Sequence, residues 1–172
     1  MNEERGDARG FGQADAIMSA KYASMDQFVV VLDWVISQRP DSPYSRFGLF
    51  RIAFDHPEIL GSTFGAPDAM RRLNEFGALL AATVRRTDLV ARDLSVFWIL
   101  TPECNSEIMG CRISEILIKV EEIGLDVVNC TVDAHVFPLE NADLSNARLL
   151  LKSLESLPAA YRYEPAAERG TS

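Results

Sequence analysis

Apolar residues recur about every 3.6 positions in four stretches of the chain, which is the spacing of one face of an α-helix. The first stretch, residues 14–37, lacks glycine and proline and ends before Pro40. The others cover residues 67–85, 103–122 and 142–157, and we expect four amphipathic helices. The side chains expected to face inward are, along the chain, Ile17, Tyr22, Met25, Phe28, Val29, Leu32, Ile36, Met70, Leu73, Phe76, Leu80, Val84, Ile108, Cys111, Ile116, Val120, Leu149, Leu150 and Leu154.

Strand-like patterns occupy the segments between these helices. Residues 47–54 (FGLFRIAF) are rich in aromatic and branched side chains, which predicts a central strand. Residues 88–92 and 95–101 are expected to form a hairpin with a very short turn near Asp93 and Leu94. Residues 127–137 alternate strictly, which predicts one buried face and one polar, solvated face. A short helical piece and a turn are expected between the first strand and the second helix.

The order strand, helix, hairpin, helix, strand is a split βαββαβ arrangement, an α/β (α+β) sheet with helices around it. A length of 172 residues suits one domain. We expect it to span residues 13–157, between a disordered N-terminal tail (1–12) and a C-terminal tail (158–172) rich in Ala, Pro and Glu.

Charge and composition limit the possible functions. A formal net charge of -8 disfavours broad nucleic-acid binding. A small anionic ligand remains possible, because a local arginine cluster can hold it and nearly all the cationic residues are arginine. The charged N-terminal stretch and the lack of a long apolar run predict a cytoplasmic protein without a membrane span. Three cysteines without CxxC spacing favour neither disulfides nor a metal site and are expected to be buried or half-buried.

Several framework positions have the residue types of one bacterial family. The sequence resembles a GGDEF domain, the diguanylate cyclase fold, over most of its length. The positions that carry the resemblance are Phe54-Asp55-His56, Phe64-Gly65, Leu73, the RxxDxxxR pattern at Arg85, Asp88 and Arg92, and Pro102.

The positions that carry this family's chemistry differ. Ala53 stands where the resemblance implies a metal-binding aspartate, and Gly61 and Met70 stand where guanine-binding Asn and Asp are implied. The signature hairpin, Gly-Gly-Asp/Glu-Glu-Phe, is replaced by residues 94–97 (LSVF) and is one residue shorter. The family's initial DxLT and C-terminal YxAK motifs are also absent. Because phosphoryl transfer depends on positioned metal and charge, we expect no cyclase activity, no metal and no cofactor.

A second site of the family is retained. The RxxD of the product-binding I-site corresponds to Arg85 and Asp88, and the resemblance implies cyclic di-GMP as its ligand. Arginine can donate to the guanine O6 and N7 while aspartate accepts from N1 and N2. One RxxD is expected by chance in a chain of this composition, so the motif alone is weak evidence for an I-site. The stronger evidence is its position, with Asp88 four residues before Arg92. Arg86 and Arg112 are further candidate contacts.

Three functions follow as hypotheses. The first is a catalytically inactive cyclic di-GMP receptor that signals by homodimerisation or by docking to a signalling partner. The second is a ligand-free interaction scaffold in bacterial signalling or polar localisation, in which Arg85 and Asp88 form only a surface ion pair. The third, a residual nucleotide-processing enzyme, requires carboxylates that the hairpin lacks. Acid–base chemistry at Thr131, Asp133 and His135 is disfavoured, because alternating polar residues usually mark a solvated strand face.

Overall fold

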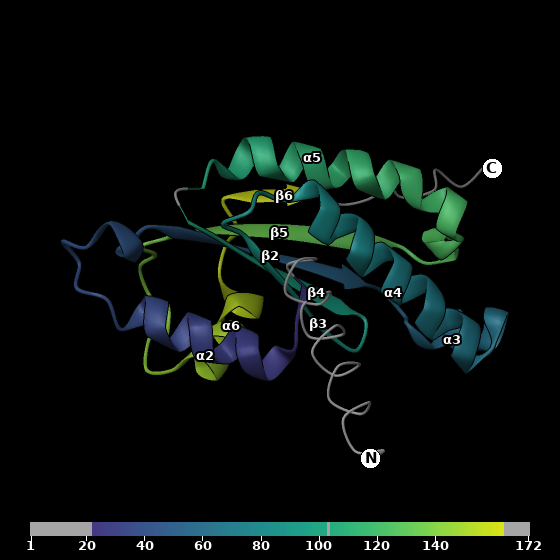
Figure 1. Ribbon diagram of the computed structural model, residues 1–172, viewed down its shortest axis with the longest axis horizontal. Helices are drawn as coiled ribbons and strands as arrows, with labels where there is room; N and C mark the ends of the chain where they lie inside the picture. Colours follow the sequence, from purple (N-terminus) through teal and green to yellow (C-terminus); the bar gives the residue numbers. More distant parts are fainter. Residues whose placement is uncertain (1–21, 103, 164–172) are drawn as a thin grey trace, which may run out of the picture.

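A mixed α/β architecture organises the residues that the computed structural model describes, which are 22–102 and 104–163 (Figure 1). The strands are β1 (Tyr22–Ala23), β2 (Phe47–Phe54), β3 (Leu89–Asp93), β4 (Val96–Pro102), β5 (Cys130–Phe137) and β6 (Tyr161–Tyr163). The α-helices are α2 (Met25–Ile36), α3 (Glu58–Phe64), α4 (Ala66–Thr83), α5 (Ser106–Lys119) and α6 (Ala147–Ser153). Short 3-10 helices are η1 (Pro43–Ser45), η2 (Val120–Ile123), η3 (Leu125–Val127) and η4 (Leu154–Ser156).

The six strands form one sheet in the order β1-β3-β4-β2-β5-β6. Every pair is antiparallel except β1 with β3. The segment from β2 to β5 is the expected split βαββαβ unit, with β2 central between β4 and β5. The fold class predicted from the sequence is therefore confirmed.

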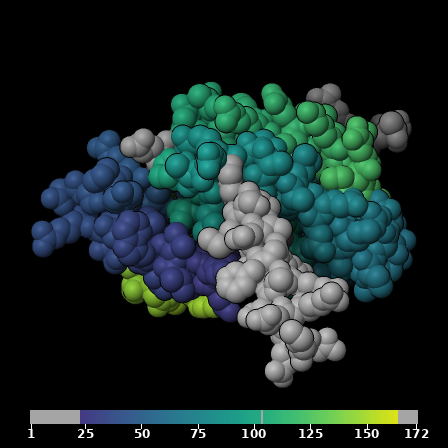
Figure 2. Space-filling model, viewed as in Figure 1, coloured from purple at the N-terminus to yellow at the C-terminus, as the bar shows by residue number. Residues whose placement is uncertain are grey.

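Helices cover both faces of the sheet. In Figure 1, α5 lies above it and α2 and α6 lie below it, and α4 packs in the same core as α5. The space-filling view shows the surfaces of α5 and α2 at opposite sides of the molecule (Figure 2). The sheet separates two apolar cores. The α4/α5 core centres on Phe50, Phe76 and Phe97, and the rings of Phe76 and Phe97 meet edge to face at 5.0 Å. The α2/α6 core contains Phe28 and Leu150.

Capping residues set where the helices begin and end. The side chain of Ser24 accepts a hydrogen bond from the Gln27 amide. The side chain of Gln27 in turn accepts one from the Ser24 amide, which completes a capping box. The helix predicted over residues 14–37 therefore starts at residue 25, and residues 22–23 form β1 instead. Its predicted part before residue 22 lies outside the described residues. Gly124 adopts a left-handed conformation (φ 77°) and ends η2, where the sequence placed the end of the third helix.

Several side chains that were predicted to face inward are exposed, namely Met70, Ile108, Cys111 and Leu149. The buried stripes run one position away from them. In α4 the stripe is Ala69, Leu73, Phe76 and Leu80, and along α5 into η2 it is Met109, Ile113, Ile116 and Val120, each with steps of four, three and four. Those steps keep a stripe on one helix face, whereas Met70, Ile108 and Cys111 point away from it. In α6 the buried positions are Ala147, Leu150 and Leu151.

The prediction that β5 has one solvated face was wrong. Asp133 and His135 are 7% and 2% exposed, because α6 and the chain that follows it cover this face as well. Asp133 accepts a hydrogen bond of 2.6 Å from Nε of Arg162, and the ring of His135 is hydrogen-bonded to the backbone of Pro158. Burial lowers the pKa of His135. These polar side chains tie the end of the described chain to the sheet.

The sheet also extends beyond the predicted domain boundary at residue 157. β6 pairs with β5, and the Tyr161 hydroxyl lies 3.1 Å from Oγ of Ser114 on α5. The ring of Tyr161 packs directly against Gly110. The predicted tails over residues 1–12 and from 164 onward lie outside the described residues. None of the described helices has the length and apolar character needed to cross a membrane.

Replacing Gly110 by alanine is expected to displace β6. A Cβ at this position would overlap the Tyr161 ring, and such overpacking costs about 1–3 kcal/mol, against which the better helix propensity of alanine returns at most about 1 kcal/mol. Urea unfolding should therefore show Gly110→Ala to be less stable than wild type. Gly61→Ala in α3 is the matched control, since no atom lies within 4 Å of the place that its Cβ would occupy, and it should be neutral or stabilising. Equal stability of the two variants would contradict this packing.

Candidate functional site

The Arg85–Asp88 segment forms the tight turn between α4 and β3. Val84 leaves the helix with an extended backbone, and the amide of Asp88 donates to the carbonyl of Arg85 at 3.0 Å. In return, Oδ2 of Asp88 accepts from the Arg85 amide at 2.9 Å. The aspartate side chain thus closes the turn and is fully buried.

The Arg85 side chain connects this turn to the end of β4. Its Nη2 donates to Oγ1 of Thr101 at 2.8 Å and to the carbonyl of Pro102 at 2.9 Å. Its Nε lies 3.6 Å from Oδ2 of Asp88. The side chain is nevertheless 46% exposed, so part of the guanidinium remains open to solvent.

One acceptor in this turn has no partner. Oδ1 of Asp88 is buried and makes no hydrogen bond with any described residue. An unsatisfied buried acceptor costs about 1–3 kcal/mol, and native structures contain few of them. The turn therefore holds an unused carboxylate oxygen beside a half-exposed arginine.

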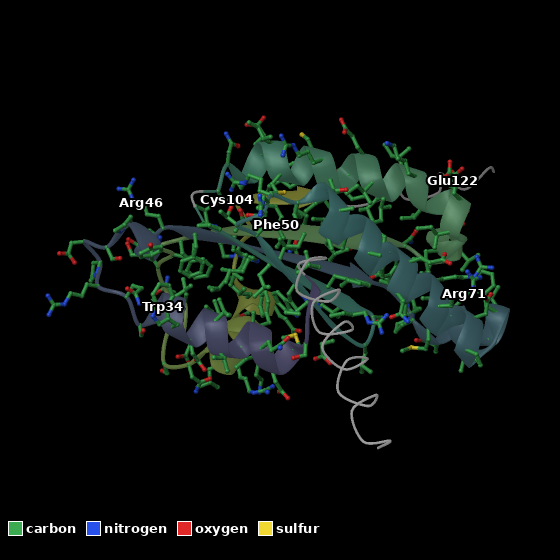
Figure 3. All side chains as sticks on the ribbon, in the orientation of Figure 1. Trp34, Arg46, Phe50, Arg71, Cys104 and Glu122 are labelled. Atoms are coloured by element: carbon green, nitrogen blue, oxygen red, sulfur yellow. The ribbon has the colours of Figure 1, made fainter. Side chains whose placement is uncertain are left out.

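The chain after β4 packs tightly beside this turn. Cys104 is half-buried, and burial raises the pKa of its thiol to about 11, although the nearby Arg85 acts in the opposite direction. A Cβ on Gly48 of β2 would lie 2.6 Å from the Cys104 Cβ. Figure 3 shows Cys104 at the end of the sheet where β4 leads into α5. Cys130 is buried as expected, while the exposed Cys111 corrects that expectation.

Arg86 and Arg112, the two additional candidates, are both exposed. Neither forms a hydrogen bond or an ion pair with any described residue. Arg86 belongs to the Arg85–Asp88 turn, whereas Arg112 lies on α5. The structure thus places one of them in the turn and leaves the other on a neighbouring helix.

The hairpin between β3 and β4 borders a separate hollow of about 630 Å³, which we name the hairpin hollow. Its lining includes Ala53 and Asp55 at the end of β2, Ser95 in the turn, Thr131 on β5 and Arg162 on β6. Ala53 is paired with Val96, so the end of β2 and the hairpin adjoin. Neither position carries a carboxylate.

The arginines of the hairpin hollow already face carboxylates. Arg51 lies 3.7 Å from Glu155, and Arg162 lies 2.6 Å from Asp133. Sequence reasoning missed this cluster, because β6 and the burial of β5 were not foreseen. The alternation Tyr161-Arg162-Tyr163 is the one local signal that could have indicated the last strand. Among the described residues, no group of three or more His, Cys, Asp or Glu side chains is arranged to hold a metal ion.

The described fold matches solved GGDEF domains. The GGDEF domain of YfiN (TpbB) from Pseudomonas aeruginosa aligns with a TM-score of 0.60 over 80% of this chain and 88% of that chain, at 17% identity. The GGDEF domain of DgcB from Caulobacter crescentus, solved in complex with c-di-GMP, gives a TM-score of 0.62 over 78% of this chain and 82% of that chain, at 12% identity. The diguanylate cyclase SiaD from P. aeruginosa, solved with its activator SiaC, gives a TM-score of 0.55 over 88% of this chain and 66% of that chain, at 17% identity.

The sequence matches no family model and no curated protein. The structural likeness therefore establishes the fold, and this chain has a GGDEF-like fold.

The tip of the hairpin has a strained backbone that a substitution can test. Leu94 has a φ of 54° and is 80% exposed. A left-handed conformation costs a residue such as leucine about 1–2 kcal/mol, whereas asparagine tolerates it. Leu94→Asn should therefore raise the free energy of unfolding by up to about 1 kcal/mol, since little apolar surface is lost. Ile118→Asn, at a helical position that is also largely exposed, is the control and should not stabilise the protein. A loss of stability in Leu94→Asn would show that the exposed leucine makes a contact this backbone does not explain.

Proposed function

We propose that this chain is a catalytically inactive, GGDEF-like receptor that binds cyclic di-GMP through Arg85 and Asp88. The observation that carries the proposal is the unpartnered Oδ1 of Asp88, held beside the Arg85 side chain, which is 46% exposed. A guanine offers acceptors at O6 and N7 for the arginine and donors at N1 and N2 for the carboxylate. A bidentate arginine–guanine contact of this kind is worth about 1–3 kcal/mol.

The charges around the turn support an anionic ligand. Arg86 and Arg112 are exposed and form no ion pair with a described residue, although the chain as a whole carries a net charge of -8. Cations without partners can contact the phosphates of a dinucleotide without first breaking an ion pair. The GGDEF domain of DgcB was itself solved in complex with c-di-GMP.

The lack of catalysis is the second part of the proposal. Ala53 and the shortened hairpin supply no carboxylate for a metal, and Gly61 and Met70 offer no side-chain hydrogen bonds to a guanine. In the hairpin hollow, Arg51 and Arg162 already face Glu155 and Asp133. Little positive charge is left there for a triphosphate, and phosphoryl transfer depends on such charge.

A ligand-free scaffold is the second candidate. The Asp88 carboxylate is fully buried, and Arg85 is already bound to Thr101 and Pro102, so a ligand must displace these contacts to engage both side chains. This geometry favours a purely structural turn. SiaD, which shares the fold, was solved in complex with a protein activator, and docking of a protein partner is the corresponding function here.

Thermal shift with cyclic di-GMP distinguishes the two candidates. A ligand at one hundred times its Kd stabilises the native state by about 2.7 kcal/mol, and each kcal/mol moves Tm by about 2–4 °C at this size. Wild type should therefore gain roughly 5–10 °C, and Arg85→Ala should gain nothing. Asp88→Asn keeps an acceptor for the Arg85 amide but presents an amide to the guanine, so it should fold and lose the shift. Arg148→Ala, an exposed arginine on α6, is the control.

No shift of wild type at millimolar ligand would overturn the receptor proposal in favour of the scaffold. An unchanged shift in Arg85→Ala would show that the ligand binds elsewhere. The Tm of each variant without ligand shows whether the turn itself is intact.

Incubation with GTP and magnesium tests the absence of catalysis. We expect no cyclic di-GMP and no pyrophosphate above a protein-free control, measured by chromatography of the nucleotides. The physical reason is the missing carboxylate at Ala53 and in the hairpin. Product that persists through repurification and disappears on Thr131→Ala or Arg51→Ala, both in the hairpin hollow, would contradict the proposal.

A further inference from the structure

A second hollow, of about 200 Å³, borders the Arg85–Asp88 turn at Thr87, and we name it the aromatic hollow. Its lining includes Val31 and Trp34 of α2, Tyr44 of η1, Leu89 of β3, Pro102 of β4, and Thr87. Figure 3 shows Trp34 at the C-terminal end of α2, below the segment that carries Arg46. The lining is almost entirely apolar.

Two aromatic rings at the rim are unusually exposed. Trp34 is 52% exposed and Tyr44 is 53% exposed, and their ring centroids lie 5.2 Å apart at an interplanar angle of 62°. At this exposure, Trp34 is not part of either apolar core. Such half-exposed aromatic side chains next to a hollow are typical of binding surfaces.

The aromatic hollow shares its wall with the proposed ligand site. Thr87 is the third residue of the turn that Asp88 closes, and the carbonyl of Pro102 accepts a hydrogen bond from Arg85. A ligand held by Arg85 and Asp88 therefore lies at the edge of this hollow. One molecule with two planar groups can reach both.

The charges near the aromatic hollow fit an anion. Arg86 adjoins Thr87 of the lining, and Arg39 and Arg46 lie before and after the segment that carries Tyr44, although none of the three lines the hollow itself. All three are exposed and form no ion pair with a described residue, and Asp41 is the one carboxylate between Arg39 and Arg46. An apolar hollow with aromatic rings and such arginines suits a planar base joined to a phosphate.

We propose that the aromatic hollow binds a purine base of the same dinucleotide, stacked on Trp34 or Tyr44. This inference rests on the proposed function, and it adds residues that lie outside the RxxD motif. Arg85 and Asp88 hold one guanine, and the second base lies on the α2 side of the turn rather than the α5 side. A second copy of the chain fits this hollow less well, because a twofold contact would bring the same arginines of both copies together.

Tryptophan fluorescence reports directly on this hollow. The two tryptophans differ strongly in exposure, since Trp98 is 6% exposed and Trp34 is 52% exposed. Titration of wild type with cyclic di-GMP should quench the exposed component, with the same Kd that calorimetry gives. Trp34→Phe keeps an aromatic ring, so calorimetry should still detect binding while most of the fluorescence change is lost.

Removing the rings should weaken binding. Stacking of a base on an aromatic side chain is worth about 1–3 kcal/mol by alanine substitution. If the base stacks on Trp34, Trp34→Ala should increase Kd by about 5- to 150-fold, and if it stacks on Tyr44, Tyr44→Ala should do so. Tyr44→Phe, with its ring retained, should bind like wild type. Ile118→Ala, an exposed apolar truncation on α5, is the matched control and should leave Kd unchanged.

The outcomes separate the two proposals. If Trp34→Ala and Tyr44→Ala both bind as tightly as wild type while Arg85→Ala does not bind, this inference fails and the receptor proposal stands. If wild type shows no binding, both fail. If Trp34→Ala leaves Kd unchanged but alters the oligomeric state in size-exclusion chromatography, the hollow is a protein contact and the inference is overturned.

Discussion

The pairing of β2 with both of its neighbours is the constraint on which the rest of the structure depends. β2 pairs with β5 along its whole length and with β4 from Phe47 to Ala53, and all its residues except Arg51 are buried. A strand in this position needs apolar side chains on both faces and must have helices on both sides. The two cores, Phe50 on one face and Leu49 on the other, follow from this strand.

The candidate site is anchored to the same strand through β4. Thr101 and Pro102, which accept hydrogen bonds from Arg85, lie at the end of β4 opposite the start of β2. The absence of a side chain at Gly48 allows Cys104 to pack against that start. The Arg85–Asp88 turn is therefore held by the sheet rather than by local sequence alone. Within the turn, Oδ1 of Asp88 has no partner and is buried beside Arg85, whose guanidinium already donates to Thr101 and Pro102.

Fold and chemistry place different demands on a sequence. The described fold matches solved GGDEF domains, and the positions beside the hairpin carry Ala53, Ser95 and Val96. Keeping a fold requires apolar spacing, which many sequences satisfy, whereas a reaction requires particular groups at particular atoms. The two ends of the sheet accordingly differ. One end has the hairpin hollow with arginines facing carboxylates, and the other has the turn, surrounded by arginines that form no ion pair with a described residue.

The sequence by itself determined the elements whose signals are local. The residues of β2, the short hairpin, the buried Leu73, Phe76 and Leu80 of α4 and the position of the RxxD turn all follow from spacing and turn chemistry within a few residues. Only the tertiary structure decided which surfaces are covered. His135 and Asp133 are buried because a distant segment packs over β5, and Trp34 is exposed although it lies on an apolar helix. The burial of Asp88 and its unpartnered oxygen were likewise not visible in the motif. Burial of a strand or helix face depends on segments far away in the chain. The local sequence pattern does not indicate which of these segments will pack against that face.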